Sequence, residues 1–160
     1  MLAHFLTTVL DMLGELAQLS RVHEYEKTYW IMVEGDPDPD KLIQLERGIQ
    51  LKHYLTLLAK VRLISEPDLP TRSKPVTPHG PTSWIEIKLR VGKKRQIRHM
   101  TAAVGLPTLR LIRVAIGSLR LGSLEPGHWR NLTMKEVEEL KNQQGKAKKA
   151  KSVSSTNRYI

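Results

Sequence analysis

A chain of 160 residues, 40% of them hydrophobic, is long enough to bury the core of a single domain. It has no cysteine, which excludes disulfides and cysteine-ligated metal sites and fits a reducing compartment. The formal net charge of +10 predicts a polyanionic partner, nucleic acid first, although a basic surface can serve solubility alone. Half of that charge lies in residues 145–160, which we expect to form a disordered basic tail.

The first 20 residues carry a helical pattern. Apolar residues recur at three- and four-residue spacing from Leu2 to Leu19, which predicts an amphipathic helix on the core. Asp11 and Glu15 interrupt the run and no cationic stretch precedes it. A signal peptide or a membrane span is therefore disfavoured, and a helix lying on a membrane surface is the weaker alternative.

Two strands and a helix are predicted next. Residues 26–35 are rich in β-branched and aromatic residues, which predicts a strand with Lys27 and Tyr29 on one face. The aspartates and prolines of residues 36–40 predict a turn that caps a helix over about 41–47. Residues 51–58 follow no clear period, whereas 59–64 predict another strand.

The proline-rich stretch from Ser65 to Ser83 predicts a long surface loop. After it, residues 84–89 alternate between apolar and polar, the pattern of a half-buried strand with Glu86 and Lys88 away from the core. Residues 97–104 then predict a helix, with its apolar stripe made by Ile97, Met100, Thr101 and Val104.

Residues 109–116 predict a strand that carries Arg110 and Arg113, and 118–121 predict a shorter one. Thr133 and Glu136 have the spacing of a capping box for a helix over about 134–144. Guanidinium groups near the first turn of the 97–104 helix favour an anion such as phosphate.

Taken residue by residue, these features define no reaction. A basic run such as residues 93–99 is most often an ordinary solvated helix start, and His99 has no metal-ligand spacing. Tyr29, Trp84 and Trp129 are by default packing residues. The residues alone therefore predict a small α+β domain with a polyanion-binding site.

The order of the motifs resembles the RsuA/RluE-type ribosomal RNA pseudouridine synthases over residues 26–132. The resemblance is carried by Lys27-Thr28-Tyr29, by Val33-Glu34-Gly35, by Gly92 to Gly117 and by residues 124–130. The run GLPTLRLIRVAIG looks most like the branch called ribosomal large subunit pseudouridine synthase E. The implied fold is an α+β catalytic domain over residues 1–144, a mixed, mostly antiparallel sheet with flanking helices, with part of the N-terminal half missing.

The resemblance also implies a chemistry. Such enzymes isomerise a specific uridine of ribosomal RNA to pseudouridine after the base has been flipped from its stack. Tyr29 matches the active-site tyrosine that stacks on that base, and Arg98 matches the arginine that keeps a catalytic aspartate ionised. The implied RNA contacts are all cationic: Lys27, Lys93, Lys94, Arg95, Arg110 and Arg113.

What the resemblance implies about partners is equally specific. It implies no metal and no cofactor, a monomer that acts on ribosomal RNA, of the large subunit, in the cytoplasm, and no membrane contact. Lys93-Lys94 stands where the family usually has Arg-Asn, and His99 where it usually has a second arginine. These differences keep most of the positive charge but lose bidentate guanidinium geometry.

One departure concerns the nucleophile, an aspartate that the family carries in a segment resembling GRLDxxSEGLLLLTNDG, before an LAHxLT-like run. Leu2 to Thr7 resembles that run and only Met1 precedes it, and the neighbours of Asp11 do not match the motif. We therefore expect this chain to be inactive unless a segment carrying the aspartate is supplied. Three hypotheses remain: an N-terminally incomplete synthase, a non-catalytic RNA-binding domain derived from one, or an interaction protein with a basic surface.

Overall fold

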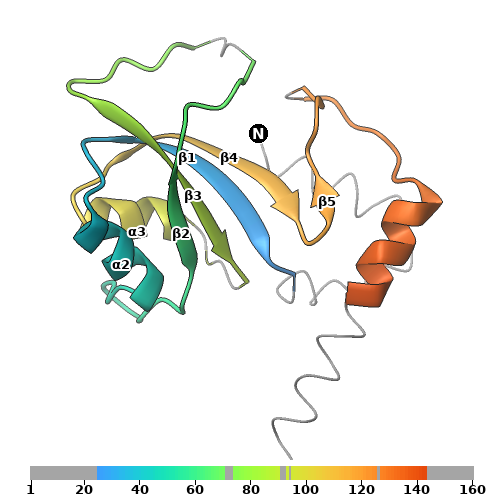
Figure 1. Ribbon diagram of the computed structural model, residues 1–160, viewed down its shortest axis with the longest axis horizontal. Coiled ribbons are helices and arrows are strands. Elements are labelled where there is room, and N and C mark those ends of the chain that lie inside the picture. Colours follow the sequence, from blue (N-terminus) through green and yellow to red (C-terminus); the bar gives the residue numbers. More distant parts are fainter. Residues whose placement is uncertain (1–24, 71–73, 91–92, 94, 126, 144–160) are drawn as a thin grey trace, which may run out of the picture. The chain divides into compact units, whose positions relative to one another are not determined.

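The computed structural model describes residues 25–70, 74–90, 93, 95–125 and 127–143 (Figure 1). The chain divides into two compact units, one made of residues 26–114 and the other containing Tyr25 and residues 115–143. The hydrogen-bonded strand order is β2-β3-β1-β4-β5. Several predictions lie outside the described residues: the helix from Leu2 to Leu19, Asp11, Gly92, Lys94 and the tail over 145–160.

The larger unit is built on an antiparallel sheet. β1 (Lys27–Glu34) pairs with β3 (Thr82–Leu89), and β3 pairs in turn with β2 (Lys60–Ile64). β4 (Thr108–Ile116) lies on the other side of β1. The strands predicted from residues 26–35, 59–64, 84–89 and 109–116 are confirmed, with β3 beginning two residues earlier than predicted.

Helix α2 (Pro39–Arg47) confirms the helix predicted after the Asp-Pro turn. The Asp38 carboxylate caps it by accepting a hydrogen bond from the backbone N–H of Lys41 at 2.9 Å, and Pro39 occupies the first turn, where no N–H is needed. The helix ends at Gly48, whose φ of 95° suits glycine. Local chemistry at both ends therefore sets its length.

Helix α3 (Gln96–Ala103) and α2 supply side chains to the same core as the sheet. Successive residues of a strand point to opposite faces, and Ile31 and Val33 of β1 lie on the face that carries this core. The helical stripe predicted for α3 is confirmed, since Met100 and Thr101 are fully buried. The buried apolar cluster comprises Ile31, Val33, Leu45, Val61, Ile85, Ile87, Leu89, Ile97, Met100 and Leu106.

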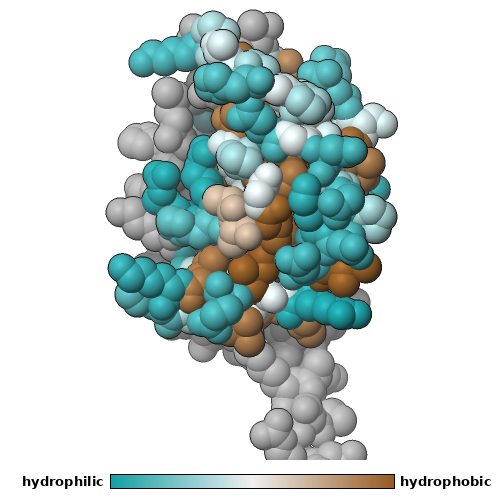
Figure 2. Space-filling view, turned by 90° about the vertical axis from the view of Figure 1, so that its left-hand side faces the viewer, coloured by the Kyte–Doolittle hydropathy of each residue, from teal (hydrophilic) through white to brown (hydrophobic). Residues whose placement is uncertain are grey.

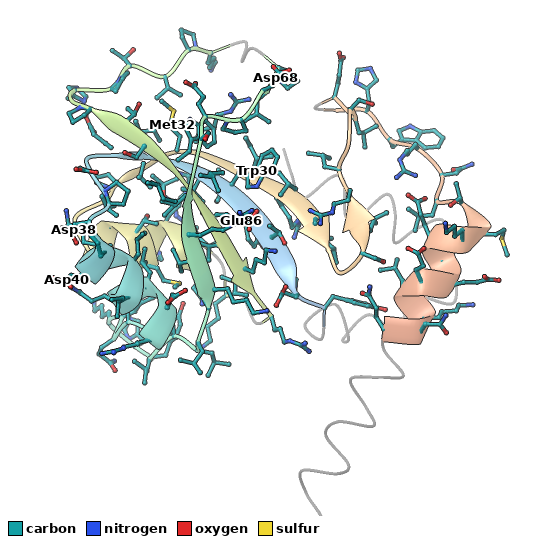
Figure 3. All side chains as sticks on the ribbon, viewed as in Figure 1. Trp30, Met32, Asp38, Asp40, Asp68 and Glu86 are labelled. Atoms are coloured by element: carbon teal, nitrogen blue, oxygen red, sulfur yellow. The ribbon has the colours of Figure 1, made fainter. Side chains whose placement is uncertain are left out.

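The opposite face of β3 corrects a prediction. Glu86 was expected to face away from the core on a half-buried strand, but it is only 4% exposed. Its carboxylate accepts hydrogen bonds from Arg62 Nε at 2.8 Å and from Trp30 Nε1 at 3.0 Å (Figure 3). These partners sit directly across the sheet, because Trp30 and Arg62 both pair with Glu86 in register. A buried carboxylate is tolerated when it is paired in this way.

The smaller unit contains the last two residues of β4, strand β5 and a C-terminal helix. β5 (Leu119–Arg120) pairs with Ala115 and Ile116 at the end of β4. The helix covers residues 134–143, and the predicted capping box is confirmed, because Thr133 and Glu136 exchange hydrogen bonds between side chain and backbone at 3.2 and 2.8 Å. Hydrogen bonding from Arg130 and then from the Thr133 backbone lowers the pKa of Glu136 to about 2.

Several large apolar side chains of the larger unit stay at the surface. Figure 2 shows one face of the molecule, on which hydrophobic side chains (brown) reach the surface between hydrophilic ones (teal). In the segment between α2 and β2 the exposed leucines are Leu55, Leu57 and Leu58, the last with 77% exposure. Burial of these leucines therefore does not explain why that segment adopts a defined path.

We predict that Glu86→Gln lowers the free energy of unfolding at pH 7 by about 1 kcal/mol, because Arg62 loses its charged acceptor. Hydrogen bonding from Arg62 first, then from Trp30, lowers the pKa of Glu86 from 4.5 to about 2. The folded chain therefore binds fewer protons than the unfolded one between these pH values. The stabilisation is present above about pH 5 and is lost as the pH falls towards 2.

Urea denaturation of the wild type and Glu86→Gln at pH 7 and pH 3 measures this difference. The gap between the two should narrow at pH 3. Glu138→Gln, at an exposed position of the 134–143 helix, is the control for the loss of one carboxylate. An equal gap at both pH values would contradict the assigned role of Glu86.

Candidate functional site

The sheet brings together three residues that the sequence predicted separately: Lys27 and Tyr29 of β1 and Arg113 of β4. Lys27 is 5% exposed and donates from Nζ to the carbonyl oxygen of Arg90 at 2.9 Å. Tyr29, two residues along the same face, is half-buried and packs against the core cluster. Its side chain forms a hydrogen bond with Arg113. We call these three residues the β1–β4 cluster.

The β1–β4 cluster is electropositive. Burial first, and then the positive charge of Arg113, lower the pKa of Lys27 from 10.5 to about 8. Burial also lowers the pKa of Arg113, and the interaction with Tyr29 opposes that shift. A buried lysine and a half-buried arginine near an aromatic ring favour an anionic group next to a flat one. A nucleotide has both parts.

Arg98 is held at a different place. It lies on α3 and donates from Nη1 to the carbonyl oxygen of Thr108 at 3.2 Å, where β4 begins. The hydroxyls of Thr101 and Thr108 are 2.7 Å apart, which ties α3 to the same strand. Arg98 therefore lies on α3 and Tyr29 on β1, and β4 is bonded to the first and neighbours the second.

The basic loop before α3 is constrained by its own backbone. The N–H of Lys93 donates to the Gln96 side chain at 2.9 Å, and the N–H of Gln96 donates to the Lys93 carbonyl at 3.0 Å. Arg95 has a φ of 59° and is the one non-glycine residue with positive φ in the described ranges. Such a conformation is uncommon for a side chain of this size and marks a loop whose shape is fixed by its surroundings. Arg95 is exposed.

Arg110 and Arg113 are three positions apart on β4, so they point to opposite faces. Arg110 donates from Nη2 to the carbonyl oxygen of Pro70 at 2.9 Å, in the proline-rich loop. Two further hydrogen bonds attach the same loop to the end of β1. The backbone N–H of His79 donates to the Glu34 carboxylate at 2.5 Å, and the N–H of Gly35 donates to the carbonyl oxygen of Pro81 at 2.7 Å. Arg110 therefore contacts the proline-rich loop, whereas Arg113 contacts Tyr29 on the other face of the sheet.

One contact of this region has no signal in the sequence pattern. The ammonium of Lys93 lies 3.7 Å from the centroid of the Tyr54 ring, in the stretch that showed no clear period. The default prediction for Trp84 is confirmed, since it is 6% exposed, whereas that for Trp129 is wrong, since it is 62% exposed. The contacts and the exposure of aromatic residues outside a periodic segment therefore could not be predicted from the hydrophobic pattern.

The described residues contain neither a metal-binding cluster nor a membrane-spanning helix. No group of three or more His, Cys, Asp or Glu side chains there could hold a metal ion. In the same part of the chain no helix is both long and apolar enough to cross a membrane. The functional candidates that remain there are the β1–β4 cluster, Arg98 and the basic loop.

The fold and this site define a basic α+β domain whose cations surround an aromatic ring, a class suited to binding nucleic acid. A family model described as RNA pseudouridylate synthase matches residues 5–103, more than half of the sequence. The chain therefore belongs to the RNA pseudouridylate synthase family. The match ends at the last residue of α3, so Arg110 and Arg113 lie beyond it.

Curated relatives carry the same resemblance. The ribosomal large subunit pseudouridine synthase E of Xanthomonas campestris pv. campestris is 49% identical over 111 residues, which are 68% of this chain and 59% of the relative. The enzyme of that name from Vibrio vulnificus is 44% identical over 110 residues, 68% of this chain and 47% of the relative. The chain spans about half the length of the curated relatives it matches.

The fold is confirmed by a solved structure titled as the crystal structure of a pseudouridylate synthase. It superimposes with a TM-score of 0.60 and 27% identity over 76% of this chain and 47% of that chain. The prediction of an RsuA/RluE-type family member with an α+β fold is thus correct.

We predict a pH signature of the buried ammonium of Lys27. Because the pKa of Lys27 is lower in the folded chain than in the unfolded one, the unfolded chain binds more protons between pH 8 and pH 10.5. The free energy of unfolding of the wild type should therefore rise relative to Lys27→Met over that range. Denaturant titrations from pH 7 to pH 10 measure it.

Lys135→Met, which removes one exposed ammonium from the 134–143 helix, is the matched control. A wild-type curve that runs parallel to that of Lys27→Met from pH 7 to pH 10 would show that Lys27 is not desolvated as described.

Proposed function

We propose that this chain takes part in the isomerisation of a uridine to pseudouridine in ribosomal RNA. The observation that carries the proposal is the β1–β4 cluster, in which Tyr29 shares a strand face with Lys27 and forms a hydrogen bond with Arg113. Family membership and relatives named as ribosomal large subunit enzymes support large-subunit RNA as the substrate.

In this proposal the aromatic ring of Tyr29 stacks on the flipped uracil, because stacking holds an unpaired base without a requirement for hydrogen bonds. Lys93, Lys94, Arg95 and Arg110 contact phosphates of the RNA, and Arg113 supplies positive charge beside Tyr29. Lys27 is too deeply buried to reach a solvent-exposed phosphate directly. We therefore propose that it fixes the start of the basic loop through the Arg90 carbonyl.

In the isomerisation the bond between the sugar and N1 of uracil breaks, a bond between the sugar and C5 forms, and the hydrogen of C5 is released to solvent. A nucleophilic carboxylate is needed to form a covalent intermediate while the base is detached. We propose that this carboxylate comes from a segment like the family's aspartate motif, which these 160 residues do not match, and that Arg98 keeps it ionised. A non-catalytic RNA-binding domain is the second candidate function, and the cations near Tyr29 and before α3 would suffice for it.

Tritium release from unmodified large-subunit ribosomal RNA labelled with 5-³H-uridine tests the proposal. We predict no release by the 160-residue chain and release by a version extended with the aspartate segment. In the extended version, Arg98→Gln should lower the rate at least about 100-fold, because the carboxylate loses the positive charge that keeps it ionised. Tyr29→Leu should also lower the rate, because the stacking platform is removed.

The extended version with asparagine in place of the motif aspartate is the control for nonspecific release. Release by the 160-residue chain itself would contradict the proposed source of the nucleophile, and Asp11→Ala would then test the one early aspartate. RNA binding without release from any version would favour the non-catalytic candidate. Absence of both binding and release would overturn the proposed function.

A further inference from the structure

The segment between α2 and β2 forms a tight turn that the function above does not use. The N–H of Leu51 donates to the carbonyl of Tyr54 at 2.9 Å, and Gln50 forms a bridge with Leu55. The N–H of Thr56 donates to the Ile49 carbonyl at 3.0 Å, and the Thr56 hydroxyl accepts from the Ile49 N–H at 2.8 Å. The turn is therefore closed by bonds on both sides.

The base of this turn is anchored and its tip is free of packing. Ile49 and Leu51 pack against the core cluster. Gly48 approaches the Thr56 backbone so closely that a Cβ there would collide with it. Lys52 and His53 at the tip are exposed. A rigid base with an exposed cationic tip presents charge at a defined place.

Tyr54 links the turn to the basic loop. Its ring lies 3.7 Å from the ammonium of Lys93, within the range of a cation–π interaction. The backbone of Lys93 is held in addition by the Gln96 side chain. An exposed lysine normally samples many rotamers, and one that is already held loses less conformational entropy when it binds a ligand.

Charge complementarity points to a polyanion as the ligand. Residues 47–65 contain no Asp or Glu. Two of their cations, Lys60 and Arg62, form ion pairs with Glu26 and Glu86, so Arg47 and Lys52 supply the charge for a ligand. Residues 87–124, which include Lys93, likewise contain no Asp or Glu and many Lys and Arg. The two acid-free segments meet at the Tyr54–Lys93 contact. Repulsion between these segments is reduced when phosphates lie against them.

We propose that Lys52, His53 and Lys93 form a second phosphate-binding surface for the RNA, with Tyr54 as the residue that positions Lys93. We call these four residues the turn surface. The inference rests on the proposed function, since it takes RNA as the partner. It adds Lys52, His53 and Tyr54, which the family motifs do not include. The surface would bind the sugar–phosphate backbone and not read a base.

Salt dependence of RNA binding tests the turn surface. The probe is a fluorescein-labelled RNA hairpin transcribed with uridines in its loop, and fluorescence anisotropy of the full chain is measured between 50 and about 200 mM salt. Log affinity falls with log salt, and each lost phosphate contact makes the magnitude of that slope smaller by about 0.7 to 0.9. Lys52→Gln and Lys93→Gln should each show that decrease.

Lys135→Gln removes the same charge from the 134–143 helix and should leave the slope unchanged. A slope that falls equally for Lys135→Gln and Lys52→Gln would overturn the inference, because net charge alone would then explain the effect. Thermal unfolding followed by circular dichroism establishes that each variant is folded before binding is compared.

A double-mutant cycle tests the role given to Tyr54. Tyr54→Leu should weaken RNA binding about 2- to 5-fold through the loss of the cation–π interaction, and Tyr54→Phe should keep wild-type affinity. In the Lys93→Gln background, Tyr54→Leu should have no further effect, because Tyr54 acts through Lys93. Equal effects of Tyr54→Leu in both backgrounds would contradict the positioning role.

The two proposals fail in distinguishable ways. If the wild-type chain does not bind the hairpin, the proposed RNA function fails and the turn surface with it. If the wild type binds with a steep salt slope and Lys93→Gln reduces that slope but Lys52→Gln leaves it unchanged, only the turn surface fails.

Discussion

The antiparallel register of β1 against β3 is the constraint on which the rest of the larger unit depends. Tyr29 lies opposite Ile87 and Trp30 lies opposite Glu86, so a shift by one residue would exchange the two faces. In the observed register the core receives Ile31 and Val33, and Lys27 and Tyr29 lie on the same side beyond them. The apolar residues that fix the register of β1 thus also determine the face of the sheet on which Lys27 and Tyr29 lie.

Local rules explain the parts of the fold that the sequence predicted well. The Asp-Pro turn with the Asp38 cap, the Thr133–Glu136 capping box and the stripe of α3 each depend on residues a few positions apart. The buried state of Glu86 depends on Arg62 and Trp30, which are more than 20 residues away along the chain. No local pattern contains that information, so the burial of Glu86 was mispredicted.

The candidate site divides in the same way. Motif order pointed to Tyr29, Arg98 and the basic loop, and the strand alternation placed Lys27 beside Tyr29. The link from Arg113 to Tyr29 required the position of β4 beside β1. Tyr54 was missed because its contact with Lys93 joins two segments 39 positions apart and one of them has no periodicity. Tertiary contacts of this kind become visible only in three dimensions.

The proline-rich loop shows how a surface can vary while its attachment stays constant. The carbonyls of Pro70 and Pro81 and the N–H of His79 make the bonds described above, so the loop is fastened by its own main chain. Main-chain groups are present whatever the side chain, with proline lacking only the N–H. Side chains in the described part of this loop can therefore be replaced without the loss of these main-chain bonds, so its surface chemistry is set independently of its attachment.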